Sequence, residues 1–239
     1  MKGKFIHSRP EVLNSKNTNA QGPRSINHAN MRPKGRGIGR LITFEGSEGC
    51  GKSTQSKMLY DYLKEHGKSV VYLREPGGVK ISEKIRDILL DAQNDLMSPV
   101  CEMLLYMAAR AQVVSEIIEP ALKKGNIIIC DRFLDSTIAY QGFGLGMDVK
   151  EIKYIGAIAT EKIKPDLTIF LDLPIEKGLK YRELSKDRIE QRSLEYHARV
   201  RNGYLALARQ EPKRIKIVKV AEDKETTQNV IRKLVDNVV

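Results

Sequence analysis

The sequence of 239 residues contains no long apolar run and few cysteines, and each absence excludes a class of protein. No stretch approaches the roughly 18 apolar residues that a membrane-spanning helix requires. The three cysteines, Cys50, Cys101 and Cys130, are widely spaced and form no Cys-x-x-Cys pair, so neither a disulfide framework nor a zinc site is expected. These absences predict a reduced, cytoplasmic protein that makes no contact with a membrane.

The composition predicts a folded, soluble protein. Hydrophobic residues make up 41% of the chain and charged residues 30%, which is typical of globular proteins and not of disordered or fibrous ones. A length of 239 residues allows one domain, or a small pair of domains, to bury a core without disulfides or metals.

The net charge of +11 comes mostly from the first 39 residues. They hold eight Lys and Arg against the single acid Glu11, a net +7, whereas the other 200 residues hold 33 basic and 29 acidic side chains, a net +4. The segment is polar, without helical or strand periodicity, so we expect a disordered basic tail over residues 1–39. It also lacks the apolar core of a secretory signal. Two interpretations stay open: a tail without function, and weak binding to polyanions.

From residue 40 onward, short apolar runs alternate with amphipathic stretches. This alternation is typical of βα units that build a parallel sheet. It predicts one three-layer α/β domain over residues 40–239, with a parallel β-sheet flanked by helices. The expected strands are 41–44, 69–73, 126–130, 167–171 and 214–220, and the expected helices are 52–66, 81–89, 98–120, 188–208 and 226–238.

A phosphate-binding motif follows the first expected strand. Residues 46–53 match G-x-x-x-x-G-K-[ST] between a strand and a helix, which is the context that a P-loop requires. Glycines let backbone N–H groups converge on an anion, and the N-terminus of the following helix adds partial positive charge. Lys52 would contact the β- and γ-phosphates, and the Ser53 hydroxyl would bind Mg²⁺. The motif predicts a P-loop NTPase fold and an ATP site formed by Gly46, Ser47, Glu48, Gly49, Cys50, Gly51, Lys52, Ser53 and Thr54.

The residues around the motif narrow the reaction class. An Asn-Lys-x-Asp guanine-recognition motif is absent, which disfavours a GTPase switch. Asp131 ends the third expected strand, where an acid can reach Mg²⁺, and it is followed by Arg132 instead of the catalytic glutamate of many ATPases. A cation next to the metal site suits an enzyme that holds a second phosphate. We therefore expect phosphoryl transfer to a phosphorylated acceptor and not to water.

Four further segments support a specific family. They are Arg74-Glu75-Pro76-Gly77-Gly78, Ala108-Ala109-Arg110-Ala111-Gln112, the stretch from Asp131 to Gly142, and Asp187-Arg188-Ile189-Glu190. In this order, and together with the P-loop, they make residues 40–239 resemble the bacterial thymidylate kinases, which are nucleoside monophosphate kinases. The resemblance implies a phosphotransferase with a phosphate group as acceptor, which transfers the γ-phosphoryl group of ATP to dTMP. It also implies dTDP biosynthesis, a Mg²⁺ requirement and a homodimer.

The resemblance assigns roles at the phosphate and sugar of dTMP. Arg132 matches the arginine that contacts the acceptor phosphate, and Arg86 matches a second phosphate-contacting arginine. Tyr140 resembles the tyrosine that crowds the ribose 2′ position, and Glu48 matches the acid that approaches the 3′-hydroxyl. A dianionic acceptor next to ATP requires such cations, because like charges must be screened.

The resemblance also assigns four residues to the base. Tyr106 falls where the family usually has a phenylalanine that stacks on the base, and Arg110 resembles the residue that hydrogen-bonds the thymine. Ser136 and Gln141 match positions near the thymine edge. An aromatic face and a few fixed donors and acceptors suit a planar base.

The resemblance also implies that a mobile lid supplies one more catalytic cation, because Cys50 stands where some family members carry a basic residue in the P-loop. Lys52 is the only Lys or Arg in the P-loop, so another cation must balance the charge on the transferring phosphoryl group. The candidate lid, residues 179–187, is short and contains one arginine, Arg182, next to Lys180 and Lys186. We expect Arg182 to be this cation, since a guanidinium can bridge two phosphate oxygens.

Two alternatives remain at this point. The chain could be another deoxynucleoside monophosphate kinase, which a comparison of acceptors would show. It could instead be a nucleic-acid-associated P-loop ATPase that uses the basic tail. The near-neutral balance of residues 40–239 argues against nucleic acid as a partner.

Overall fold

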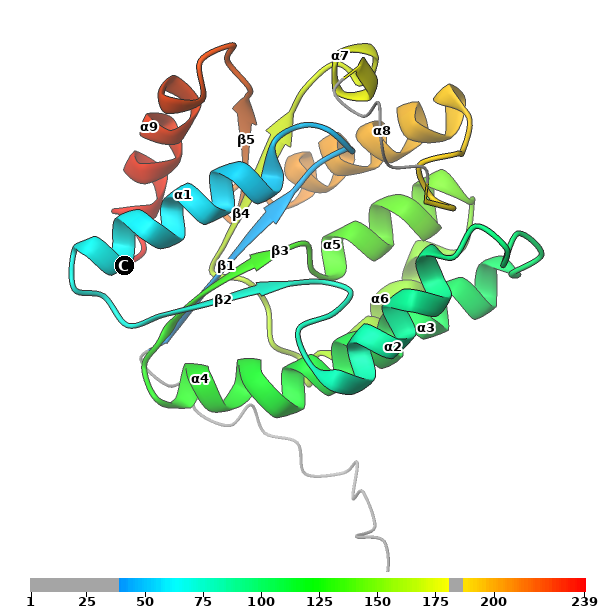
Figure 1. Ribbon diagram of the computed structural model, residues 1–239, viewed down its shortest axis with the longest axis horizontal. Helices are drawn as coiled ribbons and strands as arrows, with labels where there is room; N and C mark the ends of the chain where they lie inside the picture. Colours follow the sequence, from blue (N-terminus) through cyan, green and yellow to red (C-terminus); the bar gives the residue numbers. More distant parts are fainter. Residues whose placement is uncertain (1–38, 181–186) are drawn as a thin grey trace, which may run out of the picture. The chain divides into compact units, whose positions relative to one another are not determined.

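Five parallel strands form the central sheet, in the order β2-β3-β1-β4-β5 (Figure 1). In this computed structural model, residues 39–180 and 187–239 are described; the expected tail up to residue 38 and the lid cation Arg182 lie outside them. Every strand pair is parallel, which confirms the predicted fold class. The strands are β1 (Arg40–Glu45), β2 (Val70–Arg74), β3 (Ile127–Asp131), β4 (Leu167–Asp172) and β5 (Ile215–Lys219).

Helices connect the strands and complete the layers. Two segments, η2 and η3, are π-helical, a geometry that often occurs at functional sites. The helical elements are α1 (Lys52–Glu65), α2 (Lys80–Leu90), α3 (Pro99–Val113), η2 (Val114–Ile118), α4 (Glu119–Lys123), α5 (Leu134–Thr137), η3 (Ile138–Gly144), α6 (Val149–Ala159), α7 (Ile175–Lys180), α8 (Leu194–Gln210) and α9 (Lys224–Val235).

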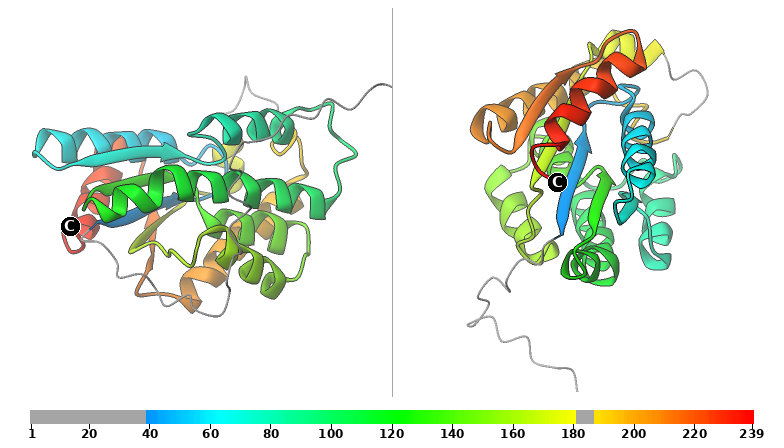
Figure 2. Two further views of the ribbon diagram at one scale, coloured as in Figure 1. Left: turned by 90° about the horizontal axis from the view of Figure 1, so that it is seen from below. Right: turned by 90° about the vertical axis from the view of Figure 1, so that its left-hand side faces the viewer.

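Alternation of side chains along each strand gives the sheet two apolar faces. On β1, Ile42 and Phe44 pack in one cluster with residues of α1 and α9, whereas Leu41 packs on the opposite face with residues of α3 and α4. A third cluster joins α3, η3, α6 and α8 with Phe170 of β4. The sheet is therefore covered on both sides, as a parallel sheet requires (Figure 2).

Helix boundaries follow local capping. Pro99 begins α3 after Ser98, whose Oγ accepts from the Cys101 N–H, as the sequence predicts. The helix expected to begin at residue 188 begins only at Leu194, because Ser193 caps it. The helix expected over 98–120 is likewise divided into α3, η2 and α4.

The carboxyl ends of β1, β2 and β3 bring three sequence motifs to one edge of the sheet. The P-loop follows β1, Glu75 follows β2 and Arg132 follows β3. In the sheet, β3 lies on one side of β1 and β4 lies on the other, so the strand order reverses at β1. Ligands bind at such switch points in α/β sheets. No helix in the described ranges is long and apolar enough to cross a bilayer.

Candidate active site

The P-loop has the conformation that an anion-binding loop needs. Gly46, Gly49 and Gly51 have φ angles of 147°, 67° and 85°, which side chains with a Cβ rarely adopt. Lys52 begins α1, and its Nζ donates to the Ser47 carbonyl oxygen at 2.8 Å, so the ammonium lies along the loop. The loop therefore combines converging backbone, a helix N-terminus and a cation.

Ser53 and Asp131 form an oxygen pair at the end of the P-loop. The Ser53 hydroxyl donates to Asp131 Oδ2 at 2.6 Å. Asp131 Oδ1 is buried and has no hydrogen-bond partner within residues 39–180 and 187–239. Mg²⁺ prefers hard oxygen ligands and is usually held by one or two protein groups together with phosphates. The two side chains therefore fit Mg²⁺, with one carboxylate oxygen available to it.

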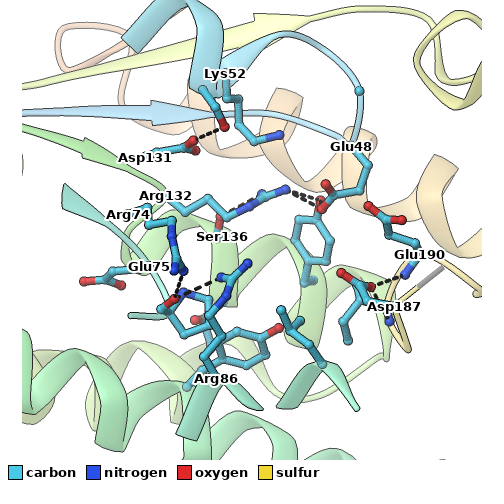
Figure 3. Close-up of a pocket in the computed structure, with 18 of the residues that line it drawn as sticks. Glu48, Lys52, Arg74, Glu75, Arg86, Asp131, Arg132, Ser136, Asp187 and Glu190 are labelled. Atoms are coloured by element: carbon cyan, nitrogen blue, oxygen red, sulfur yellow. Dashed lines mark hydrogen bonds and ion pairs between the residues drawn. The ribbon is translucent and has the colours of Figure 1, made fainter. Parts of the chain in front are cut away.

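Arg132 occupies the centre of the site in a strained backbone conformation. Its φ angle is 72°, and its guanidinium donates to the Gly46 carbonyl oxygen at 3.1 Å and to Ser136 Oγ at 3.2 Å. It also forms an ion pair with Glu48 of the P-loop, toward which it points in Figure 3. The Tyr140 hydroxyl donates to the same Glu48 oxygen at 2.8 Å. A left-handed φ is uncommon at a non-glycine residue, and these side-chain contacts hold Arg132 in it.

A buried carboxylate, Glu45, holds the residues that follow Arg132 in place. It accepts from the Phe133 N–H at 2.8 Å, from Ser136 Oγ at 2.6 Å and from the Tyr204 hydroxyl at 2.9 Å. Burial, with a contribution from the charge of Asp135, raises the pKa of Glu45 to about 7. Glu45 thus fixes the residues that follow Arg132, although it does not line the cavity.

The raised pKa of Glu45 predicts a pH-dependent stability. Between its ordinary value of 4.5 and about 7, the folded protein holds a proton that the unfolded chain releases, so the free energy of unfolding falls as pH rises through this window. Glu45→Gln replaces the titratable carboxyl group with an amide, so this pH dependence should be absent from the variant. Urea unfolding at pH 5 and pH 8 should show that the wild type loses about 2–3 kcal/mol more than the variant. Equal losses in both proteins would contradict the assignment.

Arg74 and Arg86 form a second group of cations near the P-loop, which we call the cationic wall. Each donates to the Pro76 carbonyl oxygen at 3.0 Å, so the two guanidinium groups lie side by side (Figure 3). Burial, and then the charge of Arg74, lowers the pKa of Arg86 below its ordinary value. Arg74 also forms an ion pair with Glu83 at 3.0 Å, and an anion next to the two guanidinium groups would add a further counter-charge.

One cavity of about 450 Å³ connects the P-loop with this wall. Most of the residues assigned to nucleotide sites by the sequence line it: Glu48, Gly49, Gly51, Lys52, Ser53, Thr54, Arg86, Tyr106, Asp131, Arg132, Ser136, Tyr140 and Gln141. Gly46, Ser47, Cys50 and Arg110 are not among its lining residues. Lining residues without an individual assignment are Arg74, Glu75, Pro76, Leu90, Thr137, Asp187, Ile189 and Glu190.

Arg110 lies one layer behind the cavity wall. It is 2% exposed, and its guanidinium donates to Glu75 Oε2 at 2.7 Å, to Thr137 Oγ1 at 3.0 Å and to the Phe133 carbonyl oxygen at 3.0 Å. Glu75 and Thr137 themselves line the cavity. Arg110 therefore orients two wall residues, and its direct contact with a base stays a prediction.

A second cavity, of about 760 Å³, lies on the other side of the P-loop. Cys50 is 1% exposed and lines this second cavity. Burial raises the pKa of the Cys50 thiol, and Lys52 Nζ donates to its Sγ at 3.7 Å, so the side chain packs inside the P-loop. The other lining residues are Gly49, Gly51, Thr54, Gln55, Leu173, Lys177, Val220, Ala221, Glu222, Lys224 and Thr227.

Two glycines allow α7 to contact the P-loop backbone. A Cβ on Gly178 of α7 would lie 2.6 Å from the Glu48 carbonyl oxygen, and a Cβ on Gly49 would lie 2.0 Å from the Gly178 carbonyl oxygen. Both neighbours are backbone atoms, so neither can move without displacing its element. Helix α7 therefore packs directly on the phosphate-binding loop at Gly178, just before the candidate lid.

Gly178→Ala is expected to weaken ATP binding about tenfold or more, since the added methyl group must displace either α7 or the P-loop. Alanine favours helix over glycine, so a loss cannot arise from helix propensity. Calorimetric titration with ATP gives the Kd. Glu176→Ala, an exposed change in the same helix, is the matched control and should bind as the wild type does. A Gly178→Ala protein with the wild-type Kd would refute the steric argument.

Comparison with known proteins places this site in a family. A sequence profile described as thymidylate kinase matches residues 44–231. The thymidylate kinase of Geotalea uraniireducens (strain Rf4) is 47% identical over 202 residues, which cover 81% of this chain and 95% of that protein. The thymidylate kinase of Geotalea daltonii is 51% identical over 191 residues, with 76% and 89% covered.

A solved structure agrees with the sequence matches. The crystal structure of thymidylate kinase from Ehrlichia chaffeensis superposes with a TM-score of 0.69 at 32% identity. The match covers 82% of this chain and 98% of that one. Profile, sequence identity and fold all agree with the motifs at the carboxyl ends of β1, β2 and β3. The chain belongs to the thymidylate kinase family.

Proposed function

We propose that the chain transfers the γ-phosphoryl group of ATP to dTMP, giving dTDP and ADP, as a step of dTTP biosynthesis. The observation that carries this function is the single cavity in which the P-loop meets three arginines, Arg74, Arg86 and Arg132. A P-loop accounts for one polyphosphate, and the additional arginines account for a second phosphate. A kinase that acts on a nucleoside monophosphate needs both.

The donor occupies the P-loop end of the site. The loop backbone and Lys52 hold the β- and γ-phosphates, and the ATP nucleoside extends into the second cavity, beside Thr54. Ser53 and Asp131 hold Mg²⁺, which supplies charge neutralisation for the phosphates when it is bound. Lys52 moves from the Ser47 carbonyl oxygen to the phosphates when ATP binds.

The acceptor occupies the opposite end. Arg132 and the Arg74–Arg86 pair hold the phosphate of dTMP, and Glu48 with Tyr140 contacts the deoxyribose. The base lies against Tyr106, which is half-buried at the cavity wall, with Ser136 and Gln141 near its edge. Transfer then depends on alignment and on charge neutralisation, since the protein needs to form no covalent intermediate.

Arg182, which lies outside the described residues, is the proposed lid cation. Arg182→Ala should lower kcat much more than it raises the KM for ATP, because a closing arginine acts chiefly in the transition state. Arg182→Lys should recover part of the rate, since a point charge replaces a bidentate one. Steady-state kinetics decides, with Lys186→Ala as the control. A normal Arg182→Ala together with an inactive Lys186→Ala would reassign the lid cation.

A homodimer is proposed through the outer surfaces of α2, α3 and α6. Helix α3 packs against both α2 and α6, so apolar side chains on the three helices can form one surface. Light scattering on the purified protein gives the mass, and a monomer would contradict this proposal. The exposed apolar side chains are Ile81 and Ile88 on α2, Val100 and Leu104 on α3, and Tyr154 and Ile158 on α6.

Two further proposals concern the rest of the chain. The catalytic domain comprises residues 40–239, and residues 1–39 form a basic tail that the reaction does not need. The compartment is the cytoplasm, in keeping with the absence of a disulfide framework from the sequence.

An acceptor panel tests the proposed function. ADP release is measured in a coupled assay with ATP and dTMP, dUMP, dGMP or dCMP in turn. The proposal predicts the highest kcat/KM for dTMP. A higher value for another acceptor would make the chain a different nucleoside monophosphate kinase, and ADP release that needs no acceptor would make it an ATPase.

A further inference from the structure

A buried carboxylate, Glu102, joins three segments behind the base end of the cavity. It lies in the first turn of α3 and is 0% exposed. Its Oε2 forms ion pairs with Arg188 and Arg192, both at 2.6 Å. Its Oε1 accepts from Gln141 Nε2 at 2.8 Å. The two carboxylate oxygens therefore have different partners, two cations on one and an amide on the other.

This arrangement determines how the Gln141 amide is oriented. An ionised carboxylate only accepts hydrogen bonds, and the two arginines occupy Oε2 with donors. The Gln141 group that faces Glu102 must therefore be the NH₂ group. Its carbonyl oxygen, Oε1, is then the polar group that Gln141, which lines the cavity, can present to a ligand. With one N–H of this group engaged by Glu102, Oε1 is the acceptor that Gln141 can present to the cavity.

We infer that Glu102 is a positioning residue that selects the base of the acceptor nucleotide by fixing the Gln141 amide with its oxygen toward the cavity. Thymine and uracil carry an N3–H donor on the pairing edge, whereas the corresponding N3 of cytosine is an acceptor. A fixed acceptor at Gln141 therefore favours dTMP and dUMP and repels dCMP. The inference rests on the proposed function, because it requires a pyrimidine nucleotide in this cavity.

Glu102→Gln should reverse the orientation of the Gln141 side-chain amide. The two arginines would retain the new amide oxygen, so the new NH₂ group would face Gln141 and donate to its Oε1. Gln141 would then turn its own NH₂ group toward the cavity, which suits cytosine N3. We expect kcat/KM for dTMP to fall about 10–100-fold while that for dCMP stays constant or rises. The dTMP-to-dCMP ratio should therefore fall at least about tenfold.

Arg192→Gln is the matched control. It removes one ion pair from the same carboxylate but leaves Glu102 as an acceptor, so both kcat/KM values should change by a common factor and the ratio should stay at the wild-type value. Gln141→Leu removes the acceptor itself and should lower the ratio. Combining it with Glu102→Gln should lower the ratio no further, because both changes act through one amide.

A second measurement uses the wild type, in case Glu102→Gln does not fold. The Gln141 side-chain NH₂ resonances are assigned by their loss from Gln141→Leu. Because this group faces Glu102, solvent exchange of its hydrogens should be slow without dTMP as well as with it. Protection that appears only when dTMP binds would place the NH₂ group against the base and overturn the inference.

The kinetic outcomes separate the inference from the proposed function. A wild type that does not phosphorylate dTMP contradicts the function. A wild type that phosphorylates dTMP, with a folded Glu102→Gln that lowers both acceptors equally, contradicts the role of Glu102 alone. A fall of the ratio in Glu102→Gln but not in Arg192→Gln supports it.

Discussion

Lys52→Ala is expected to lower kcat with dTMP by about 10²–10³-fold, the largest effect of any single change in the site. The ammonium lies along the P-loop, where it can transfer from the Ser47 carbonyl oxygen to the β- and γ-phosphates. Alanine leaves the glycine loop and the helix N-terminus in place, so ATP should still bind. The loss should therefore appear mainly in kcat, since charge accumulates on these phosphates in the transition state.

Lys57→Ala is the matched control for this change. Lys57 lies on α1 as Lys52 does, but it is exposed and pairs with Asp61 at 2.7 Å on the helix surface. Its removal should leave kcat within about twofold, because exposed ion pairs contribute little. Steady-state kinetics with saturating ATP measures both variants. A Lys52→Ala enzyme with the wild-type kcat would show that the P-loop lysine has no part in transfer.

Arg132→Ala is expected to lower kcat/KM for dTMP by about 10²-fold or more, while KM for ATP changes little. Arg132 is the cation closest to the P-loop on the acceptor side, where it bonds to Glu48 and to the Gly46 carbonyl oxygen. Removing it leaves the acceptor phosphate without its central counter-charge and releases Glu48. Both effects weaken dTMP binding and misalign the acceptor.

Arg132→Lys distinguishes charge from geometry. Lysine restores a positive charge but not the planar fork that reaches Glu48, Gly46 and Ser136 together, so it should recover part of the rate. Full recovery would mean that charge alone matters. If Arg132→Ala changed KM for ATP more than kcat/KM for dTMP, the arginine would belong to the donor site instead.

Much of the fold is predictable from local signals. The expected limits of the five strands lie within one residue of the observed ones, because short apolar runs bounded by turns mark buried parallel strands. The P-loop was predictable because its function depends on the backbone of eight consecutive residues. Helix α6 (Val149–Ala159) is not among the expected helices, although Asp148 caps it and apolar residues recur at helical spacing.

The site was predictable where it consists of motifs and not where it depends on distant partners. Arg132 and Asp131 follow directly from the end of β3. The contact between Glu102 and Gln141 joins residues 39 positions apart, and the contact between Glu45 and Tyr204 joins residues 159 apart. Such pairs depend on the packing of α3, η3 and α8, which no local spacing encodes.

The fate of the γ-phosphoryl group tests the central claim most directly. The wild type is incubated with Mg²⁺ and γ-³²P-labelled ATP, with and without dTMP, and the products are separated by chromatography. The account predicts that the label moves into dTDP, and that little label is released when dTMP is omitted. Label that appears as inorganic phosphate at the same rate with and without dTMP would contradict the account.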